Sequence, residues 1–225
     1  MKTQVVSTVA LGVLLAGASG AFAQSGLILN FSSTGNLVFG GSSDSINFVP
    51  NGVEWGITSE SGSSSMGSAV GLMGGFSGGP FQYGPVTTAG SYESAPVIGP
   101  AGDLTISDGQ GNNLTGTVNF VDIATYGKVG GFINDSLTIN LAGLSYSGSN
   151  PDLVYLAQSK VGTLNLSFQF GSPGETLSQL SSGAGGYITS YSGSIAATAV
   201  PEPSSLFMSG IGALGVFGLM LQGRK

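Results

Sequence analysis

The sequence alternates without a break between apolar and polar side chains over Leu164-Asn165-Leu166-Ser167-Phe168-Gln169-Phe170. Because successive side chains of a strand point to opposite faces, the apolar residues share one face and the polar residues share the other. This pattern predicts a β-strand with one buried face and one solvent-exposed face.

A second alternating stretch, Leu137-Thr138-Ile139-Asn140-Leu141, predicts another strand of the same kind. Its phase slips at Ala142-Gly143 before Leu144-Ser145-Tyr146 resumes it, and such a slip predicts a β-bulge. No stretch of the body shows helical periodicity, so we expect an all-β fold. The shorter strand candidates are Leu27 to Phe31, Ile46 to Phe48, Val53 to Ile57, Leu104 to Ile106, Thr117 to Phe120, Leu153 to Leu156 and Tyr187 to Ala197.

Turn-forming residues separate these strands, among them Asn51-Gly52, Asp108-Gly109 and Ser172-Pro173-Gly174. Short strands joined in this way predict an antiparallel β-sandwich of jelly-roll or Greek-key type.

Residues 59–79 are rich in Gly and Ser and lack alternation, so we expect a flexible loop there. Partial disorder is the alternative for a chain with so much Gly, Pro and Ser. Large apolar side chains for a core come from Phe31, Phe39, Phe48, Phe120, Phe132, Phe168 and Phe170.

The composition excludes several classes of function. Of the 225 residues 40 are Gly, and only 7% are charged, compared with about 25% in an average domain. The chain has no Cys and no His, which removes disulfides, thiolate nucleophiles, His-metal sites and imidazole-based triads. Its formal net charge of −6 disfavours nucleic acid as a partner. We therefore expect no enzyme activity and no nucleic-acid binding.

The first 23 residues have the organisation of a secretory signal peptide. Lys2 supplies a basic start, an apolar run follows from Val9 to Ala16, and small residues close the segment at Ala21-Phe22-Ala23. Ala21 and Ala23 fit the narrow subsites of a signal peptidase, so we expect cleavage before Gln24. A retained N-terminal anchor is the alternative.

The other end of the sequence combines a Pro-rich segment, an apolar run and basic residues. Val200-Pro201-Glu202-Pro203-Ser204-Ser205 precedes an apolar run over 206–221, and Arg224 and Lys225 follow. A helix over the apolar run is about 24 Å long, and its flanks extend it enough to span a bilayer, so we expect a transmembrane helix over 204–223. The two basic residues predict that this end stays cytoplasmic. Each proline favours extended backbone in its segment.

This arrangement over residues 200–225, with a signal peptide at the other end, resembles the PEP-CTERM sorting signal of exported bacterial proteins. A membrane enzyme called exosortase recognises that signal. The resemblance implies a sorting motif at Pro201, Glu202 and Pro203, cut by an exosortase-like protease or transpeptidase. It also implies transient anchoring in the inner membrane, then delivery to the cell surface or the extracellular polysaccharide matrix. The expected layout is a signal peptide (1–23), an exported β-rich body (24–200) and a sorting signal (201–225). An ordinary tail anchor is the alternative.

Catalytic motifs find little support in the sequence. Gly75-Phe76-Ser77-Gly78-Gly79 fits the G-x-S-x-G pattern of a nucleophile elbow, but the chain has no histidine to act as the base. A G-x-G-x-x-G match at 210–215 lies inside the apolar run and is a chance match. A serine/lysine dyad would need Lys128 or Lys160 buried beside a serine, which no spacing indicates.

Two weaker site hypotheses remain. Glu54, Glu60 and Glu93 could supply paired carboxylates for glycoside hydrolysis, while Trp55 is expected in the core. Oxygen ligands for Ca²⁺, the one possible cofactor, gather in a turn-rich segment; the alternative is that this segment only forms hairpin turns. The calcium candidates are Asp103, Asp108, Asn112 and Asn113.

Three hypotheses for the body follow. The first is a structural or interaction role at the cell surface or in the matrix. The second is a carbohydrate-binding module that uses Tyr and Asn/Gln side chains on one sheet face. The third is a hydrolase that relies on carboxylates.

Overall fold

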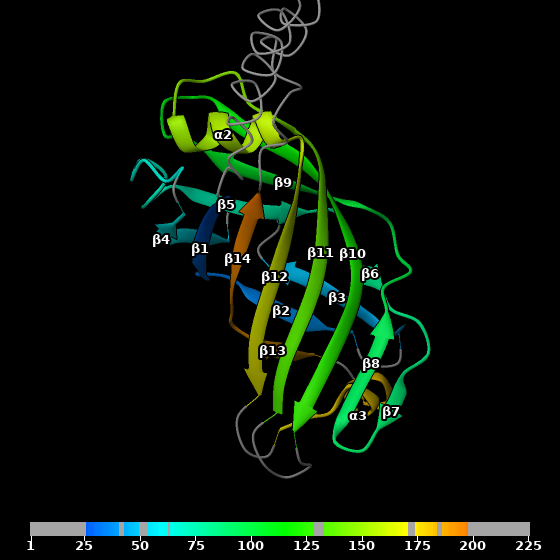
Figure 1. Ribbon diagram of the computed structural model, residues 1–225. Helices are drawn as coiled ribbons and strands as arrows, with labels where there is room; N and C mark the ends of the chain where they lie inside the picture. Colours follow the sequence, from blue (N-terminus) through cyan, green and yellow to red (C-terminus); the bar gives the residue numbers. More distant parts are fainter. Residues whose placement is uncertain are drawn as a thin grey trace, which may run out of the picture. The chain divides into compact units, whose positions relative to one another are not determined.

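The computed structural model describes residues 26–40, 43–49, 54–62, 64–127, 133–170, 174–183 and 186–197. They form strands and two helices, drawn in Figure 1. The helices are α2 (Pro151–Ser159) and α3 (Leu177–Ser182). The strands are β1 (Leu27–Ser33), β2 (Asn36–Phe39), β3 (Ser45–Val49), β4 (Trp55–Ser61), β5 (Met73–Ser77), β6 (Phe81–Gln82), β7 (Thr87–Ala89), β8 (Tyr92–Pro96), β9 (Gly102–Ser107), β10 (Asn113–Gly127), β11 (Ile133–Ser145), β12 (Val161–Phe170), β13 (Tyr187–Thr189) and β14 (Tyr191–Ala197).

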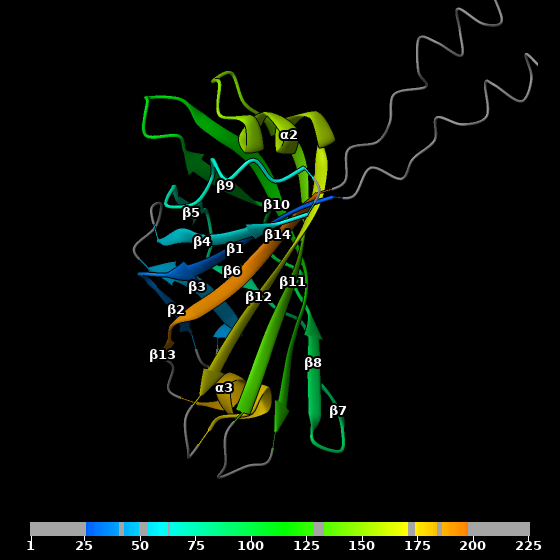
Figure 2. The ribbon, with the colours of Figure 1, turned by 60° about the vertical axis from the view of Figure 1, so that its left-hand side comes forward.

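The main sheet closes on itself. Its strands follow the order β11-β12-β14-β1-β4-β5-β9-β10, and β10 pairs back with β11, so eight antiparallel strands form a closed barrel. β10 is long enough to pair with β9 along its first part and with β8 along its last part, and β7 extends β8 at the edge. Figure 2 shows the long strands β10 to β12 running side by side.

The structure is mostly β, as predicted, but the predicted antiparallel β-sandwich is wrong. The alternation of apolar and polar residues is the same in a sandwich and in a barrel, because each needs one buried face per strand. Register shifts in the β10–β11 pair, at Thr115/Thr117 and at Phe120/Asp122, bend these strands in the way that bulges allow a sheet to curl and close.

A smaller sheet of order β13-β2-β3-β6 completes the core. Its side chains Phe39 and Phe48 are buried and contact aromatic rings of the barrel. The Phe39 ring centroid lies 5.6 Å from that of Phe168, and the Phe48 centroid lies 4.9 Å from that of Phe76. One continuous apolar core therefore joins the two sheets.

The two alternating stretches are confirmed as strands. Residues 164–170 lie in β12, with every apolar side chain buried and every polar one exposed. The stretch 137–141 lies in β11. The predicted bulge at Ala142-Gly143 is also confirmed, because the two steps of β10 from Thr115 to Thr117 face the three steps of β11 from Ser145 to Ala142. Gly143 has φ of 61°, in the left-handed region that glycine adopts without strain.

The prediction that the body has no helix is wrong, and so is the strand over Leu153 to Leu156. These residues lie in α2, which Asn150 caps: its Oδ1 accepts from the N–H groups of Asp152 (3.1 Å) and Leu153 (3.2 Å). Pro151 occupies the first helical turn, where its missing N–H costs nothing. At the start of α3, the Thr176 N–H donates to Gln179 Oε1 (2.8 Å).

The loop expected at 59–79 is strand at both ends, where β4 finishes and β5 begins. One of the two glycines of β5 is a packing requirement: a Cβ on Gly74 would overlap the Trp55 indole. Gly193 of β14 has the same role, because a Cβ there would lie 2.6 Å from Phe31 Cζ. Part of the high glycine content thus makes room for large rings inside the barrel.

Candidate functional site

The predicted processing residues lie outside the described residues. These are Ala21, Ala23 and Gln24 at the signal-peptide end and Pro201, Glu202 and Pro203 at the sorting end, together with the expected helix over 204–223. Within the ranges that the structure does describe, no helix combines the length and the apolar character needed to cross a membrane.

Two carboxyl groups and a hydroxyl form one row across three strands at the start of α3. Thr125 of β10 faces Glu93 of β8 on one side and Asp135 of β11 on the other. The first amides of α3 are bound to this row: Leu177 N–H donates to Thr125 Oγ1 (3.2 Å) and Ser178 N–H donates to Glu93 Oε2 (2.7 Å). The row therefore holds the N-terminus of α3 and satisfies donors that a helix leaves free.

Asp135 is the unusual member of this row. Its side chain is 5% exposed, and neither carboxyl oxygen has a hydrogen-bond partner in the part of the chain that is described. Burial raises the pKa of Asp135 to about 8, so the carboxyl is mostly protonated at neutral pH. The prediction from sequence missed it, although Asp135 occurs in phase with the buried residues Leu137 and Ile139.

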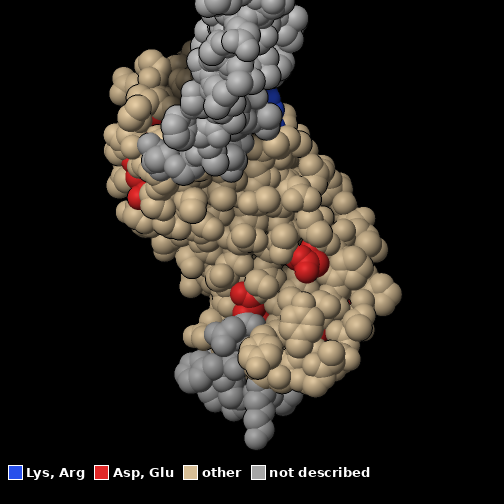
Figure 3. Space-filling model, in the orientation of Figure 1, with Lys and Arg blue, Asp and Glu red and all other residues tan. Residues whose placement is uncertain are grey.

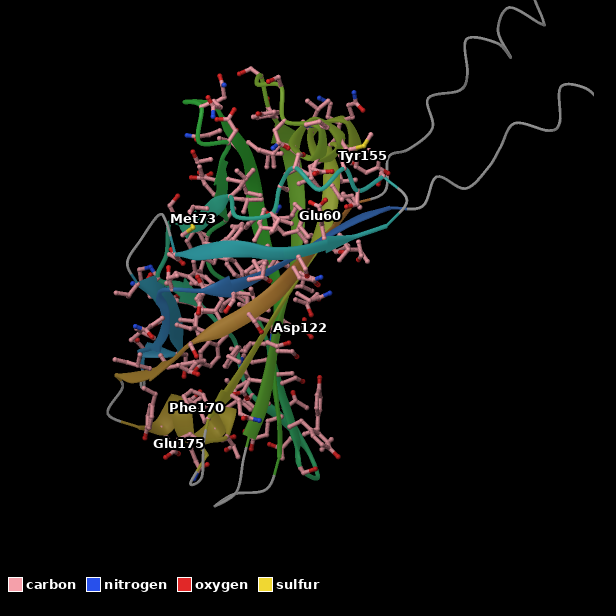
Figure 4. All side chains as sticks on the ribbon, turned by 90° about the vertical axis from the view of Figure 1, so that its left-hand side faces the viewer. Glu60, Met73, Asp122, Tyr155, Phe170 and Glu175 are labelled. Carbon is pink, nitrogen blue, oxygen red and sulfur yellow. The ribbon has the colours of Figure 1, made fainter. Side chains whose placement is uncertain are left out.

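The three glutamates considered for glycoside hydrolysis do not come together. Glu60 lies in β4, and Glu54 is the residue just before this strand. The six-residue separation between them spans about 20 Å in an extended chain. Glu54 is fully buried and accepts a hydrogen bond from Tyr191 Oη (2.6 Å), while Glu60 Oε1 accepts from Ser65 Oγ (2.6 Å). Figure 4 labels Glu60 on β4. Burial, then the contact with Glu54, raises the pKa of Tyr191.

Glu93 and Asp135 stand two strand spacings apart, or about 10 Å. Hydrolysis would need a sugar between two such carboxyls. That position is occupied by Thr125 and the α3 amide bound to it. Trp55 is fully buried, as expected for a core residue.

Of the four calcium candidates only Asp108 and Asn112 come together, through hydrogen bonds to each other. Asp103 is an exposed residue of β9, and Asn113 begins β10. Asp108 Oδ1 accepts from the N–H groups of Gln110 (2.7 Å) and Asn112 (3.0 Å), and its Oδ2 accepts from Asn112 Nδ2 (3.0 Å) and Tyr146 Oη (2.8 Å). Desolvation acts to raise the pKa of Asp108, but these hydrogen bonds outweigh it and lower the pKa to about 2. The Asp108 carboxylate therefore organises a turn, which agrees with the alternative that this segment only forms hairpin turns.

The described ranges contain no group of three or more His, Cys, Asp or Glu side chains placed to bind a metal ion. The G-x-S-x-G match has Gly75, Phe76 and Ser77 in β5, so it does not form a strand-to-helix turn. Lys160 is exposed at the end of α2, and Lys128 lies outside the described residues.

Asp152 is buried and joins α2 to the segment that follows β4. Its Oδ1 accepts from Met66 N–H (2.9 Å), and its Oδ2 accepts from Ser68 N–H (2.9 Å), Ser68 Oγ (2.6 Å) and Ala69 N–H (3.1 Å). Burial acts to raise the pKa of Asp152, but these hydrogen bonds outweigh it and lower the pKa. Asp152 therefore serves as a structural anchor.

One comparison with known proteins found a match. Residues 199–225 match the family model described as the PEP-CTERM protein-sorting motif. No curated protein and no solved structure matches the chain. The chain thus carries a PEP-CTERM sorting signal, as the resemblance over residues 200–225 implied, and this signal indicates export and processing by an exosortase-type enzyme.

Proposed function

We propose that this protein is a non-enzymatic exported protein with a structural or interaction role at the cell surface or in the extracellular polysaccharide matrix. The observation that carries the proposal is the PEP-CTERM motif at residues 199–225. Signal peptidase removes residues 1–23, and the exosortase-type enzyme cuts near Pro201-Glu202-Pro203. The body then leaves its transient anchor in the inner membrane.

The hydrogen bonds of three acids, of which Glu54 and Asp152 are buried and Glu93 is half-buried, support a role without catalysis. Glu54, Glu93 and Asp152 each accept hydrogen bonds that hold neighbouring elements together. These side chains act as structural acceptors.

The ends of the body suit processing at both sides. Leu27, the first residue of β1, pairs with Ala197, the last residue of β14. Cleavage before Gln24 and near Pro201 would therefore remove no residue of the barrel. The processed body keeps every strand pair that the structure describes.

The test is the substitution Glu202→Ala in the producing cells. We expect the full-length form to accumulate in the inner membrane and the shortened form to disappear from the surface and matrix fractions on a gel. Glu175→Ala, which changes a glutamate near α3 (Figure 4), is the matched control and should be processed normally. Normal shortening of the Glu202→Ala protein would refute the proposal.

A further inference from the structure

The outer face of four neighbouring barrel strands carries small uncharged polar side chains in two rows. Each row runs across β11, β12, β14 and β1 through directly paired residues. We call these eight residues the polar face: Ser136, Ser167, Ser192 and Ser32 in one row, and Thr138, Asn165, Ser194 and Asn30 in the other. Adjacent strands lie about 4.8 Å apart, so hydroxyl and amide groups recur at that spacing across the barrel.

The polar face lacks charge. β1, β12 and β14 contain no charged residue, and the one in β11, Asp135, is buried in the interior. Asp122 of β10, opposite Thr138, is the acid at its edge. Figure 3, which looks onto the outside of β10 to β12, shows a surface with few charged atoms. An ordinary soluble domain carries about 25% charged residues, most of them on such outer faces.

Two exposed tyrosines border the polar face. Tyr92 of β8 pairs directly with Tyr126 of β10, and their side chains are 40% and 61% exposed. Tyr126 lies two residues from Ala124, the partner of Ser136, so both rings lie on the outside of the barrel beside the serine row. A tyrosine ring offers an apolar surface together with a hydroxyl at its tip.

We propose that the polar face and the Tyr92–Tyr126 pair bind an uncharged polysaccharide chain. Sugar hydroxyls both donate and accept hydrogen bonds, as the Ser, Thr and Asn side chains here do, and the apolar faces of sugar rings can stack on tyrosine. The proposal rests on the proposed function, which brings the protein to polysaccharide outside the cell.

Other occupants fit this surface less well. An acidic polysaccharide would find no Lys or Arg on the polar face, and the net charge of −6 would repel it. A second copy of the chain would bury little apolar area between rows of Ser, Thr and Asn, whereas stable homodimer interfaces are rich in apolar area. An uncharged polyhydroxyl chain matches both the charge and the hydrogen-bonding groups.

The test is affinity electrophoresis of the full chain, kept soluble in a polyoxyethylene detergent that contains no sugar. Native gels contain hydroxyethylcellulose, dextran or galactomannan as neutral probes, or alginate as the acidic probe. We expect retardation by at least one neutral polymer and none by alginate. Asn165→Asp, which places a charge in the centre of the polar face, should weaken the binding at least tenfold, as should the double substitution Tyr92→Ala, Tyr126→Ala. Asn113→Asp, at the far end of β10, is the matched control and should bind as the unchanged chain does.

Three results would overturn the proposal: no retardation by any neutral polymer, binding to alginate alone, or equal weakening by Asn165→Asp and Asn113→Asp. Concentration-dependent dimerisation in light scattering that Asn165→Asp abolishes, without polymer binding, would instead assign the face to a second copy and also overturn it. These results leave sorting untouched, because Glu202→Ala is scored by processing in cells. Failure of the binding and failure of the proposed function are therefore distinguishable.

Discussion

Asp135 places an acid in the apolar interior of the barrel, and this changes how the protein responds to pH. An unfolded aspartate has a pKa of about 3.9, whereas burial raises the pKa of Asp135 to about 8 in the folded protein. Between these values the folded state keeps a proton that the unfolded state has released. The contribution of Asp135 to stability is thus fully present below pH 4 and is lost as the pH rises toward 8.

Replacing Asp135 with Asn should remove this pH dependence. One pKa unit corresponds to about 1.4 kcal/mol, so the free energy of unfolding of the unchanged protein should fall by up to roughly 4 kcal/mol more than that of Asp135→Asn between pH 5 and pH 8. Urea unfolding at each pH measures the difference, and Asp122→Asn, on the outside of β10, is the control. Parallel curves for Asp135→Asn and the unchanged protein would show that the carboxyl does not hold its proton.

The role of Asp135 could only partly be predicted from sequence. Its phase with Leu137 and Ile139 places it on the inner face once the strand is known. The absence of a partner within the described residues depends on what β10 and β12 bring opposite to it, namely Thr125 and Phe168. Those pairings join residues far apart in the chain, and no local pattern encodes them.

At the scale of elements, α2 and the segment before β5 stabilise each other through one carboxylate. Asp152 lies in the first turn of α2, and its two oxygens accept from three backbone N–H groups of residues 66–69. A segment rich in Gly and Ser has little side-chain packing to fix it, so these hydrogen bonds supply the order.

Asp152→Asn should loosen this segment. The amide group keeps one acceptor oxygen and directs its Nδ2 at donors that the carboxylate satisfied, so we expect a loss of about 2–4 kcal/mol in the free energy of unfolding. The amides of Met66, Ser68 and Ala69 should exchange faster with solvent. Asp103→Asn, an exposed change on β9, provides the comparison in the same hydrogen-exchange experiment. Unchanged protection at these three amides would contradict the anchoring role.

The helices illustrate a limit of short patterns. Leu153 to Leu156 is a short apolar run, which fits a buried strand and a helix equally well. The preceding Asn150-Pro151-Asp152 is the signal that separates them, because it supplies a cap, a first-turn proline and an acid near the helix N-terminus. Thr176 and Gln179 give a comparable signal for α3.

At the scale of the whole molecule, closure of the barrel depends on its shortest junction. β4 and β5 share two register pairs, Trp55 with Gly74 and Gly56 with Met73, whereas β11 and β12 share ten. The strand that completes the ring, β5, has the sequence Met73-Gly74-Gly75-Phe76-Ser77, which shows no alternation. For this reason the other strands of the barrel could be predicted from sequence, whereas β5, and with it the closed barrel, could not.

The β4–β5 junction should open before the rest of the barrel. Because only two residue pairs join these strands, the free energy of local opening is lower there than between β11 and β12. The amides of Glu54 and Ile57, which donate to Gly74 O and Leu72 O (2.9 Å each), should exchange at least tenfold faster than the amides between β11 and β12. Hydrogen exchange followed by mass spectrometry measures both sets in one sample. Equal rates would mean that the barrel opens only as a unit.

The pairing of Leu27 with Ala197 has a mechanical consequence, because the chain enters and leaves the barrel at the same rung. A force that pulls these two residues apart would break the β1–β14 hydrogen bonds one after another, starting from this end. A force spread along the strands would instead act on many hydrogen bonds at the same time. A barrel attached to a partner along its strands therefore resists a pulling force better than a barrel pulled apart at Leu27 and Ala197.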